Sequence, residues 1–352
     1  MKRNLFFYIH SVAGLLSGIF ILLLSLSGAA LVFHDELDRF QQPAVYSSGN
    51  FIIPADSCFA NIQKQYPHAM ISNCNLPENA GRPFVFSVYD SSYKKGTEAM
   101  QLFLHPQSGS IIGTRGGSDD IRHNFMSWLS AFHNSFHLKK KGEWMLGFFA
   151  LVFMISLVTG FILYRKNFIP ALLFKKTVWK KTNLHQLIGS WALIFNLMIA
   201  ITGFWMQRYV FKKDFYTASS WQNIIRPTAK LNYNMDTALS GLRRQYPEFT
   251  PAVIYFAQSN SGKTAVYGSR KSNSFIHSKK FADVIALDSN GNVAKTRFIG
   301  SISADDRYDI INSQIHFGKY GGLPVKIIYS FFGLLTGLLS ITGILLWFRR
   351  KV

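Results

Sequence analysis

The sequence predicts an α-helical membrane protein with four transmembrane helices in two pseudo-symmetric halves and two extracytoplasmic α+β domains. Its 352 residues are 48% hydrophobic and 16% charged. This composition is too apolar for an ordinary soluble domain and too polar for a helix bundle alone. Four segments have the length of about 20 apolar residues that crosses a bilayer. Two long polar segments, one after the first helix and one after the third, have the pattern of strands and short helices.

The predicted organisation alternates membrane helices with outer segments. In chain order we expect a first transmembrane helix (1–34), an outer domain (35–118), an interfacial helix and turn (119–143), a second transmembrane helix (144–164), a cytoplasmic loop (165–183), a third transmembrane helix (184–207), a second outer domain (208–303), an interfacial segment (304–323), and a fourth helix with a cytoplasmic tail (324–352). The first apolar run is nearly twice as long as the apolar region of a signal peptide, so we expect an uncleaved anchor.

Basic residues gather at one end of the predicted helices. The loop at 165–181 has no acidic residue, and its basic residues are Arg165, Lys166, Lys175, Lys176, Lys180 and Lys181. Both chain ends are basic as well. The positive-inside rule therefore predicts that the termini and this loop are cytoplasmic and that the polar segments lie outside. The formal net charge of +20 then requires no nucleic acid as a partner.

Both cysteines, Cys58 and Cys74, lie in the first outer segment. A disulfide between them is chemically permitted in an oxidising compartment, and the sequence leaves open whether it forms. The sequence has no Cys-x-x-Cys-His motif, which excludes covalent attachment of a c-type haem.

The first and third membrane helices repeat one pattern at an offset of 175 residues. This offset superposes a histidine, a glycine, a phenylalanine and a Ser/Thr-Gly dipeptide: His10 on His185, Gly14 on Gly189, Phe20 on Phe195, and Ser27-Gly28 on Thr202-Gly203. We call His10 and His185 the first histidine pair. Because the two helices run in the same direction, the axis relating the halves should lie along the membrane normal.

The second and fourth helices repeat at an offset of 183 residues. Thr159-Gly160 superposes on Thr342-Gly343, and His133 superposes on His316 under the same shift. We call His133 and His316 the second histidine pair. Each pair should therefore lie at one depth, the first pair toward the inner face and the second toward the outer face.

Two matched histidine pairs at opposite membrane faces indicate function, because ionisable groups in a membrane are costly. Two imidazoles that face each other across a helix bundle can supply both axial ligands of a haem iron. Glycines follow the first-pair histidines on the same helix face and would leave room for a flat macrocycle: Gly14, Gly18 and Gly189. A Gly-x-x-x-Gly helix-packing motif is the alternative explanation for the first two, and both roles are compatible.

Other ligand sets fit less well. A zinc ion needs four close ligands, and the apolar segments place no cysteine or carboxylate near the histidines. His137 follows His133 by one helical turn and shares its face, so it is the second choice for that position.

Several motifs resemble a known family. The outer segments have a helix followed by strands, as in the PepSY domain. "HSVAGLLSG", "FHDELD", "LHQLIGSW", "HFGKYGGLPVKIIY" and "TGILLWFRRK" resemble the PepSY-associated transmembrane family over essentially the whole chain. That family includes iron-regulated inner-membrane proteins and ferric-siderophore reductases.

The resemblance implies a bacterial inner-membrane oxidoreductase. It would carry two b-type haems, with His10, His185, His133 and His316 as iron ligands, and would reduce Fe(III)-siderophore on the periplasmic side. Some relatives continue into a flavodoxin-like reductase domain, whereas this sequence stops at Val352. We therefore expect a separate electron donor, either a cytoplasmic protein or a membrane quinol.

The substrate is expected at an outer cleft between the two PepSY-like domains and the "HFGKYGG" turn, near Lys319 and Tyr320. The catalytic residues themselves are not identified. The main alternative is a non-redox PepSY-type protein that binds or senses an envelope partner, with structural histidines. A permease is disfavoured, because no helix has a proline near its middle and no charged pair lies at mid-depth.

Overall fold

The computed structural model describes residues 2–42, 50–96, 98–173, 175, 183–216, 233–257 and 263–349. The chain forms two compact units. We call the first the bundle unit; it comprises residues 1–34, 129–218 and 312–352. We call the second the sheet unit; it comprises residues 35–128 and 219–311.

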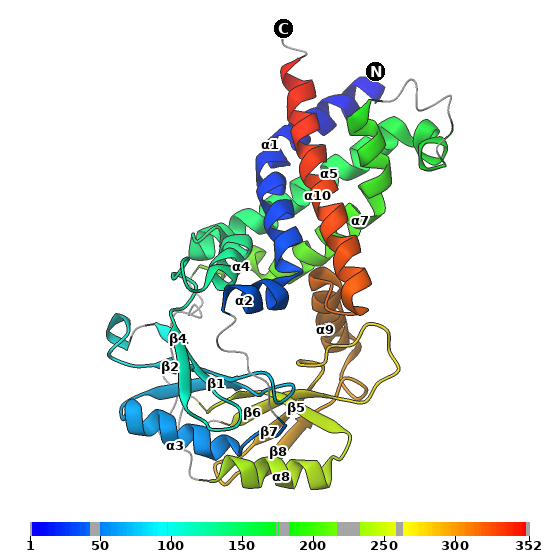
Figure 1. Ribbon diagram of the computed structural model, residues 1–352. Helices are drawn as coiled ribbons and strands as arrows, with labels where there is room; N and C mark the ends of the chain where they lie inside the picture. Colours follow the sequence, from blue (N-terminus) through cyan, green and yellow to red (C-terminus); the bar gives the residue numbers. More distant parts are fainter. Residues whose placement is uncertain are drawn as a thin grey trace. The chain divides into compact units, whose positions relative to one another are not determined.

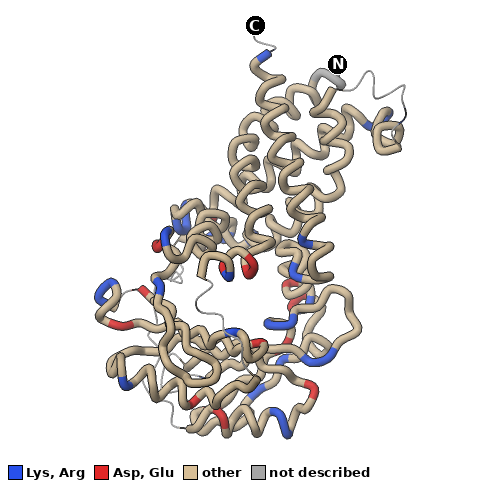
Figure 2. The backbone as a smooth tube through the Cα atoms, in the orientation of Figure 1, with Lys and Arg blue, Asp and Glu red and all other residues tan. Residues whose placement is uncertain are grey.

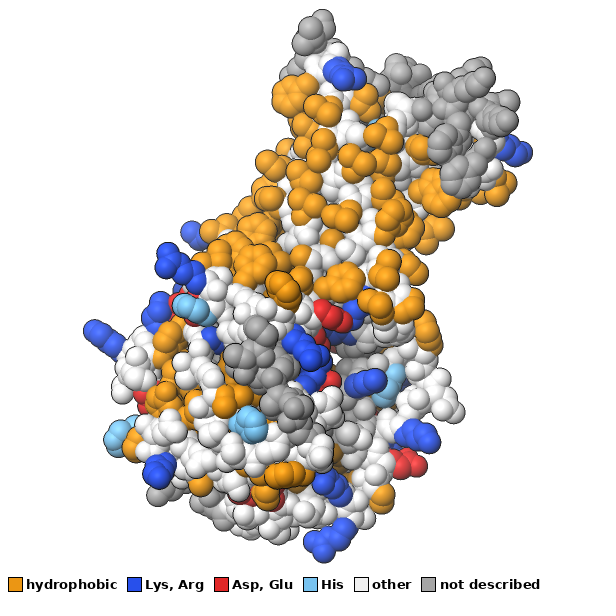
Figure 3. Space-filling view, viewed as in Figure 1, with side chains coloured by type: hydrophobic (Ala, Val, Ile, Leu, Met, Phe, Trp, Pro, Cys, Tyr) orange, Lys and Arg blue, Asp and Glu red, His pale blue; other side chains and the backbone are white. Residues whose placement is uncertain are grey.

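Four long apolar helices form the bundle unit (Figure 1): α1 (Lys2–Leu31), α5 (Lys139–Leu172), α7 (Leu184–Gln207) and α10 (Gly322–Phe348). Each is long and apolar enough to cross a membrane. Both α1 and α7 pack against α5 and against α10, so the four helices close into a ring. Lysine and arginine mark the ends of the bundle, and its middle is free of charge (Figure 2). Apolar side chains cover the visible face of the bundle (Figure 3). The chain is therefore a multi-pass membrane protein.

Sequence signals explain where the helices begin and end. α7 starts with a capping box, in which the Asn183 side chain accepts from the Gln186 amide and the Gln186 side chain accepts from the Asn183 amide. α5 is longer than the predicted span of 144–164 at both ends and contains Pro170 in its last turn. Most of the remaining predicted loop lies outside the described residues.

Short helices continue from the membrane helices. α2 (His34–Gln41) follows α1, and the 3-10 turn η3 (Arg208–Phe211) follows α7. The two predicted interfacial segments contain α4 (Phe125–Ser135) and α9 (Ala304–Phe317). Aspartates in the first turn of α9 favour its N-terminus electrostatically.

The turn from α4 into α5 is strained and tightly packed. Phe136, His137 and Lys139 have φ angles of 48°, 58° and 54°, a left-handed conformation that side chains with a Cβ rarely adopt. The chain turns so sharply that a Cβ on Gly142 would lie 1.7 Å from the Ser135 carbonyl oxygen. Only glycine fits at this position.

The sheet unit contains one antiparallel sheet of eight strands in the order β4-β3-β2-β1-β5-β6-β7-β8. The strands are β1 (Met70–Asn75), β2 (Phe84–Tyr89), β3 (Ala99–Leu104), β4 (Ile111–Arg115), β5 (Phe249–Tyr255), β6 (Thr264–Arg270), β7 (Asp283–Leu287) and β8 (Val293–Arg297). A 3-10 turn, η2 (Lys94–Gly96), connects β2 to β3. The two outer segments were predicted to form separate domains. The structure joins their strands into a single sheet instead, because β1 pairs with β5 from Asn73↔Tyr255 to Asn75↔Val253.

Two helices pack on the same side of this sheet: α3 (Ala55–Gln65) and α8 (Met235–Gln245) (Figure 1). Their N-termini cap each other. Asp56 accepts from the amides of Met235 and Asp236, and Asp236 accepts from those of Ala55 and Asp56. Burial, followed by the adjacent Asp236 carboxylate, raises the pKa of Asp56 above its usual value. The two outer segments therefore share helix caps as well as a sheet.

The sheet and these helices enclose one hydrophobic core with side chains from both outer segments. Cys58 and Cys74 are fully buried in it, and the structure has both thiols unlinked. Burial raises the pKa of Cys58 to about 12, so this thiol is protonated at neutral pH.

Candidate functional site

The bundle unit brings the predicted histidines together in the two expected pairs. His10 on α1 faces His185 on α7, with 6.2 Å between the ring centres. His133 on α4 faces His316 on α9, with 6.5 Å between the ring centres. All four histidines are partly buried.

These spacings suit two axial ligands on one iron atom. An imidazole nitrogen binds such a metal at about 2.0 Å and lies roughly 1.2 Å from its ring centre, so the centres of two axial rings are about 6.4 Å apart. Among the described residues, no group of three or more His, Cys, Asp or Glu side chains could hold a metal ion. Each pair thus offers two nitrogen ligands, which is what a haem iron leaves open.

Hydrogen bonds orient the first histidine pair. His10 Nδ1 lies 2.9 Å from the Ser156 carbonyl oxygen on α5. His185 Nδ1 lies 3.2 Å from the Leu339 carbonyl oxygen and 3.1 Å from Thr342 Oγ1, both on α10. A carbonyl oxygen only accepts, so His10 donates through Nδ1, and its Nε2 lone pair remains free for a metal.

The second histidine pair is held in a related way. His133 Nδ1 lies 2.9 Å from Ser27 Oγ on α1, and His316 Nδ1 lies 2.9 Å from Thr202 Oγ1 on α7. Both helices that carry this pair lie outside the four membrane spans. Burial is the main cause that lowers the pKa of His133, and of His316, to about 4. Near neutral pH both rings are therefore uncharged, which is the form that binds a metal.

A cavity of about 870 Å³ surrounds the first histidine pair. It has the size of a small-molecule or cofactor site. His10, His185 and the three predicted glycines, Gly14, Gly18 and Gly189, all line it. The glycines also allow close helix packing, because a Cβ on Gly18 would lie 3.3 Å from the Ile344 side chain. The structure is thus compatible with both explanations of these glycines.

His137 does not take the place of His133. It lies in the left-handed turn after α4, and its ring centre is 6.2 Å from that of Phe132. His133 is the residue whose ring faces His316.

Lys319 and Tyr320 lie just after the C-terminus of α9, the helix that carries His316. Lys319 Nζ lies 5.3 Å from the ring centre of Phe317. The Tyr320 hydroxyl shares a hydrogen bond of 2.8 Å with the hydroxyl of Tyr329 on α10, which itself donates to the Ile315 carbonyl oxygen. Tyr320 therefore has a structural contact, and its role at a substrate site remains a prediction.

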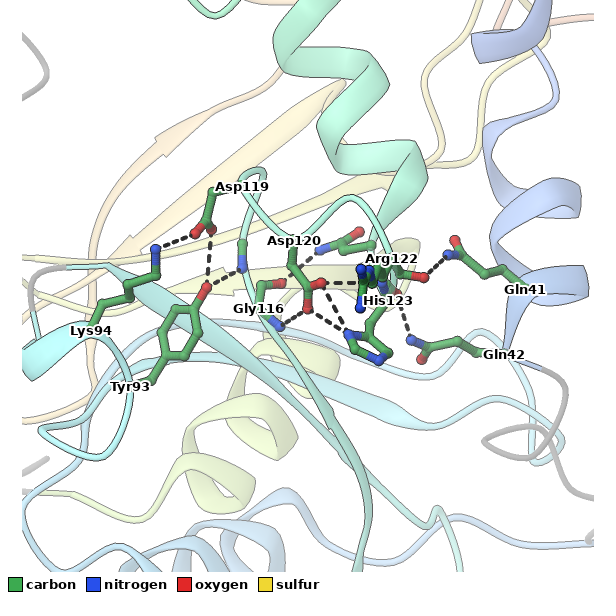
Figure 4. Close-up of polar contacts among 11 residues, drawn as sticks. Gln41, Gln42, Tyr93, Lys94, Gly116, Asp119, Asp120, Arg122 and His123 are labelled. Carbon is green, nitrogen blue, oxygen red and sulfur yellow. Dashed lines mark hydrogen bonds and ion pairs between the residues drawn. The ribbon is translucent and has the colours of Figure 1, made fainter.

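A polar network at residues 93–123 of the sheet unit was not predicted (Figure 4). Asp119 binds Lys94 Nζ at 2.7 Å and accepts from the Tyr93 hydroxyl. Asp120 accepts from the Gly116 amide and lies 3.0 Å from His123 Nδ1. A small cavity of about 280 Å³ lies among these residues. These bonds hold the loop between β4 and α4, and the Asp-Asp pair in the sequence was the available signal for them.

The repeat of the Ser/Thr-Gly dipeptides was found in the sequence, but their contacts were not predicted. Ser27-Gly28 and Thr202-Gly203 each share a helix with a histidine that they do not contact, whereas the other two dipeptides lie on α5 and α10, which carry no histidine. In the structure Ser27 contacts His133, although His10 is the histidine of its own helix. A partner in space cannot be read from a spacing within one helix.

No curated protein sequence matches the chain. The family model described as the PepSY-associated TM region matches residues 7–350. This match covers nearly the whole chain, and it agrees with the four apolar helices and the separate antiparallel sheet. The chain belongs to the PepSY-associated TM region family.

Proposed function

We propose that the protein is a di-haem membrane oxidoreductase that reduces Fe(III)-siderophore on the periplasmic side and so releases iron. The observation that carries the proposal is the spacing of 6.2 Å and 6.5 Å between the rings of the two histidine pairs. Both values match two axial imidazoles on one iron.

Two pairs support transfer across the membrane better than one pair would. Gly28, against which His133 packs, lies on α1 about 27 Å beyond His10 by helix rise, close to the roughly 30 Å apolar thickness of a bilayer. The two pairs therefore serve opposite ends of the bundle. The repeated residues and the ring of helix contacts favour two halves related by a pseudo-twofold axis along the membrane normal.

The fold provides what a b-type haem needs at the first pair. The cavity of about 870 Å³ offers space, and His10 and His185 offer two nitrogen ligands. Haem, when bound, supplies one-electron redox chemistry. The substrate class comes from the family resemblance, and the chemistry is consistent with it, because the hard oxygen ligands of a siderophore favour Fe(III) over Fe(II).

The proposed orientation rests on charge, because basic residues at both termini and at 165–181 favour a cytoplasmic position for these segments. The proposed location in a bacterial inner membrane rests on the family resemblance. The sheet unit and the second pair would then face the periplasm. The donor would be a separate cytoplasmic protein or a membrane quinol.

The direct test is a spectrum and a haem assay of detergent-purified protein. We expect the sharp reduced spectrum of bis-histidine b-type haem and two haems per chain. Addition of Fe(III)-siderophore to the reduced protein should reoxidise it at the rate at which Fe(II) appears. A full-length, monodisperse protein without haem after expression with haem supply would contradict the proposal.

A non-redox role in envelope binding is the second candidate, and the eight-stranded sheet is the feature that favours it. Such a protein would show no haem spectrum, and substitution of the four histidines would leave partner binding unchanged. The same purified sample therefore separates the two candidates.

A further inference from the structure

The four Ser/Thr-Gly dipeptides contact the four histidines across helices. A Cβ built on Gly28 or Gly203 would lie 3.1 Å from His133 Cε1 or 3.0 Å from His316 Cε1. At the first pair, the same test on Gly160 gives 2.9 Å to His10 Cε1, and on Gly343 it gives 3.1 Å to His185 Cε1 (both on the neighbouring helix). All four distances are shorter than an ordinary contact, so each ring edge lies directly against a glycine backbone.

The hydroxyl groups of the dipeptides determine which ring nitrogen carries the proton. A hydroxyl has one hydrogen to donate. Ser27 donates it to the Leu23 carbonyl at 2.8 Å, and Thr202 donates it to the Met198 carbonyl at 2.7 Å. With that hydrogen on the backbone carbonyl, each hydroxyl oxygen accepts from the histidine Nδ1 at 2.9 Å. The proton lies on Nδ1, and Nε2 keeps a free lone pair.

The histidines of the first pair also carry their proton on Nδ1, but backbone carbonyls are their main hydrogen-bond acceptors. Thr342 shares its one hydroxyl hydrogen between the Leu338 and Leu339 carbonyls, and its oxygen accepts from His185. Thr159 donates to the Ile155 and Ser156 carbonyls, and His10 donates directly to the Ser156 carbonyl. Four rings thus have Nδ1 protonated and one edge fixed by glycine.

Together the two contacts restrict rotation of each ring. The imidazole planes are held at 62° in the first pair and at 51° in the second. Neither pair is coplanar.

We propose that the Ser/Thr-Gly dipeptides are positioning elements: their glycines fix the rotation of all four histidines, and the hydroxyls of Ser27, Thr202 and Thr342 fix the tautomer of three of them, so that both haem sites receive a twisted imidazole pair. This inference rests on the proposed haem binding. It assigns Ser27, Gly28, Thr202 and Gly203 to the second site, and Thr342, Gly343 and Gly160 to the first.

Electron paramagnetic resonance of the oxidised protein tests the twist, because the largest g value of low-spin bis-histidine Fe(III) depends on the angle between the ligand planes. We expect a strongly anisotropic signal from each site. A rhombic signal typical of coplanar ligands at both sites would overturn the inference.

Substitutions at the second site test the positioning role. Ser27→Ala removes the hydroxyl acceptor and leaves the His133 ring with its backbone hydrogen bond at Leu24 alone. Gly28→Ala adds a Cβ that pushes the ring edge. We expect either change to shift the largest g value of the second site only and to release its haem about ten times faster, the lower end of the usual effect of such supporting groups.

Matched controls come from α1 and α10. Ser25→Ala removes a hydroxyl that donates to the Leu22 carbonyl at 2.9 Å, as Ser27 donates to Leu23. Gly337→Ala adds an equally crowded Cβ, 3.2 Å from Ser25 Oγ, with no histidine in contact. Both controls should leave the two signals unchanged. The unchanged signal of the first site in each variant also reports that the bundle is folded.

The outcomes separate this inference from the proposed function. A wild-type protein without haem contradicts the proposed function and the inference with it. A wild-type protein with two haems, in which Ser27→Ala and Gly28→Ala behave like their controls in both g value and haem release, contradicts the inference alone.

Discussion

The two histidine pairs reach nearly the same geometry with different support. The first comes from α1 and α7, two helices of the membrane ring, and each of these packs against both other ring helices. The second comes from the short helices α4 and α9, which lie outside the membrane spans. Ring centres 6.2 Å and 6.5 Å apart therefore arise once from long-helix packing and once from local anchoring.

Local anchoring of the second pair is visible in specific bonds. The buried Asn312 side chain on α9 donates to the Thr202 carbonyl oxygen on α7 at 3.1 Å. The Tyr329 hydroxyl on α10 donates to the Ile315 carbonyl oxygen at 2.7 Å. Whole helices support the first site, whereas single hydrogen bonds support the second. We therefore expect single substitutions near the second pair to weaken haem binding at the second site and to leave the first site unchanged.

The largest expected effect is the loss of a whole haem. His10→Ala and His185→Ala should each remove the same haem, and the double variant should lose no more, because the proposed function assigns both side chains to one iron. His10→Ala combined with His316→Ala should remove both haems. Haem content per chain measures this. If the double variant of His10 and His185 lost two haems where each single variant lost one, the pairing would be wrong.

The pairing of the histidine rings could be predicted because the sequence contains an internal repeat. Offsets of 175 and 183 residues match His10 with His185 and His133 with His316. The four membrane helices could also be predicted, because a bilayer requires a spanning helix of about 20 apolar residues. Most of the membrane part of the fold was therefore within reach of the sequence.

The rest depends on contacts between distant segments. Nothing in the sequence near Asn73 or Tyr255 states that β1 and β5 pair, so the prediction of two domains missed the single sheet. The contact of Ser27 with His133 spans 106 positions and was equally hidden. The prediction for α5 began at residue 144 because residues 139–143 are polar. A helix can extend beyond the apolar layer of the membrane, however, and α5 begins at Lys139.

A second prediction concerns the substrate face next to the second pair. Lys319→Ala combined with Tyr320→Ala should lower kcat/KM for Fe(III)-siderophore about tenfold, the effect of one lost charge-assisted hydrogen bond of about 1.5 kcal/mol. Haem content should stay at the wild-type value. Tyr320→Phe is the control for the structural bond to Tyr329, and it should keep most of the activity. Unchanged rate and KM in the double variant would place the substrate elsewhere.

A third prediction tests the anchoring of α9. Asn312→Ala removes a buried hydrogen bond worth about 1 kcal/mol, so the second haem should dissociate roughly five times faster. The first haem in the same molecule should dissociate at the wild-type rate. Asn134→Ala on α4 is the matched control, because that side chain is exposed and makes only a 3.4 Å bond to Ser130. Equal acceleration of both haems would show that the two sites share their support.

The smallest expected effect is that of His137→Ala. His137 follows His133 by four residues in sequence. The backbone after Ser135 adopts a left-handed conformation, however, and the His137 ring lies against Phe132. The variant should therefore keep two haems and both low-spin signals, whereas His133→Ala should lose the second haem. A variant His133→Ala that kept this haem, and lost it only with His137→Ala added, would show that His137 replaces its neighbour. In that case the turn before α5 would be free to move, and the second site would be less rigid than its hydrogen bonds indicate.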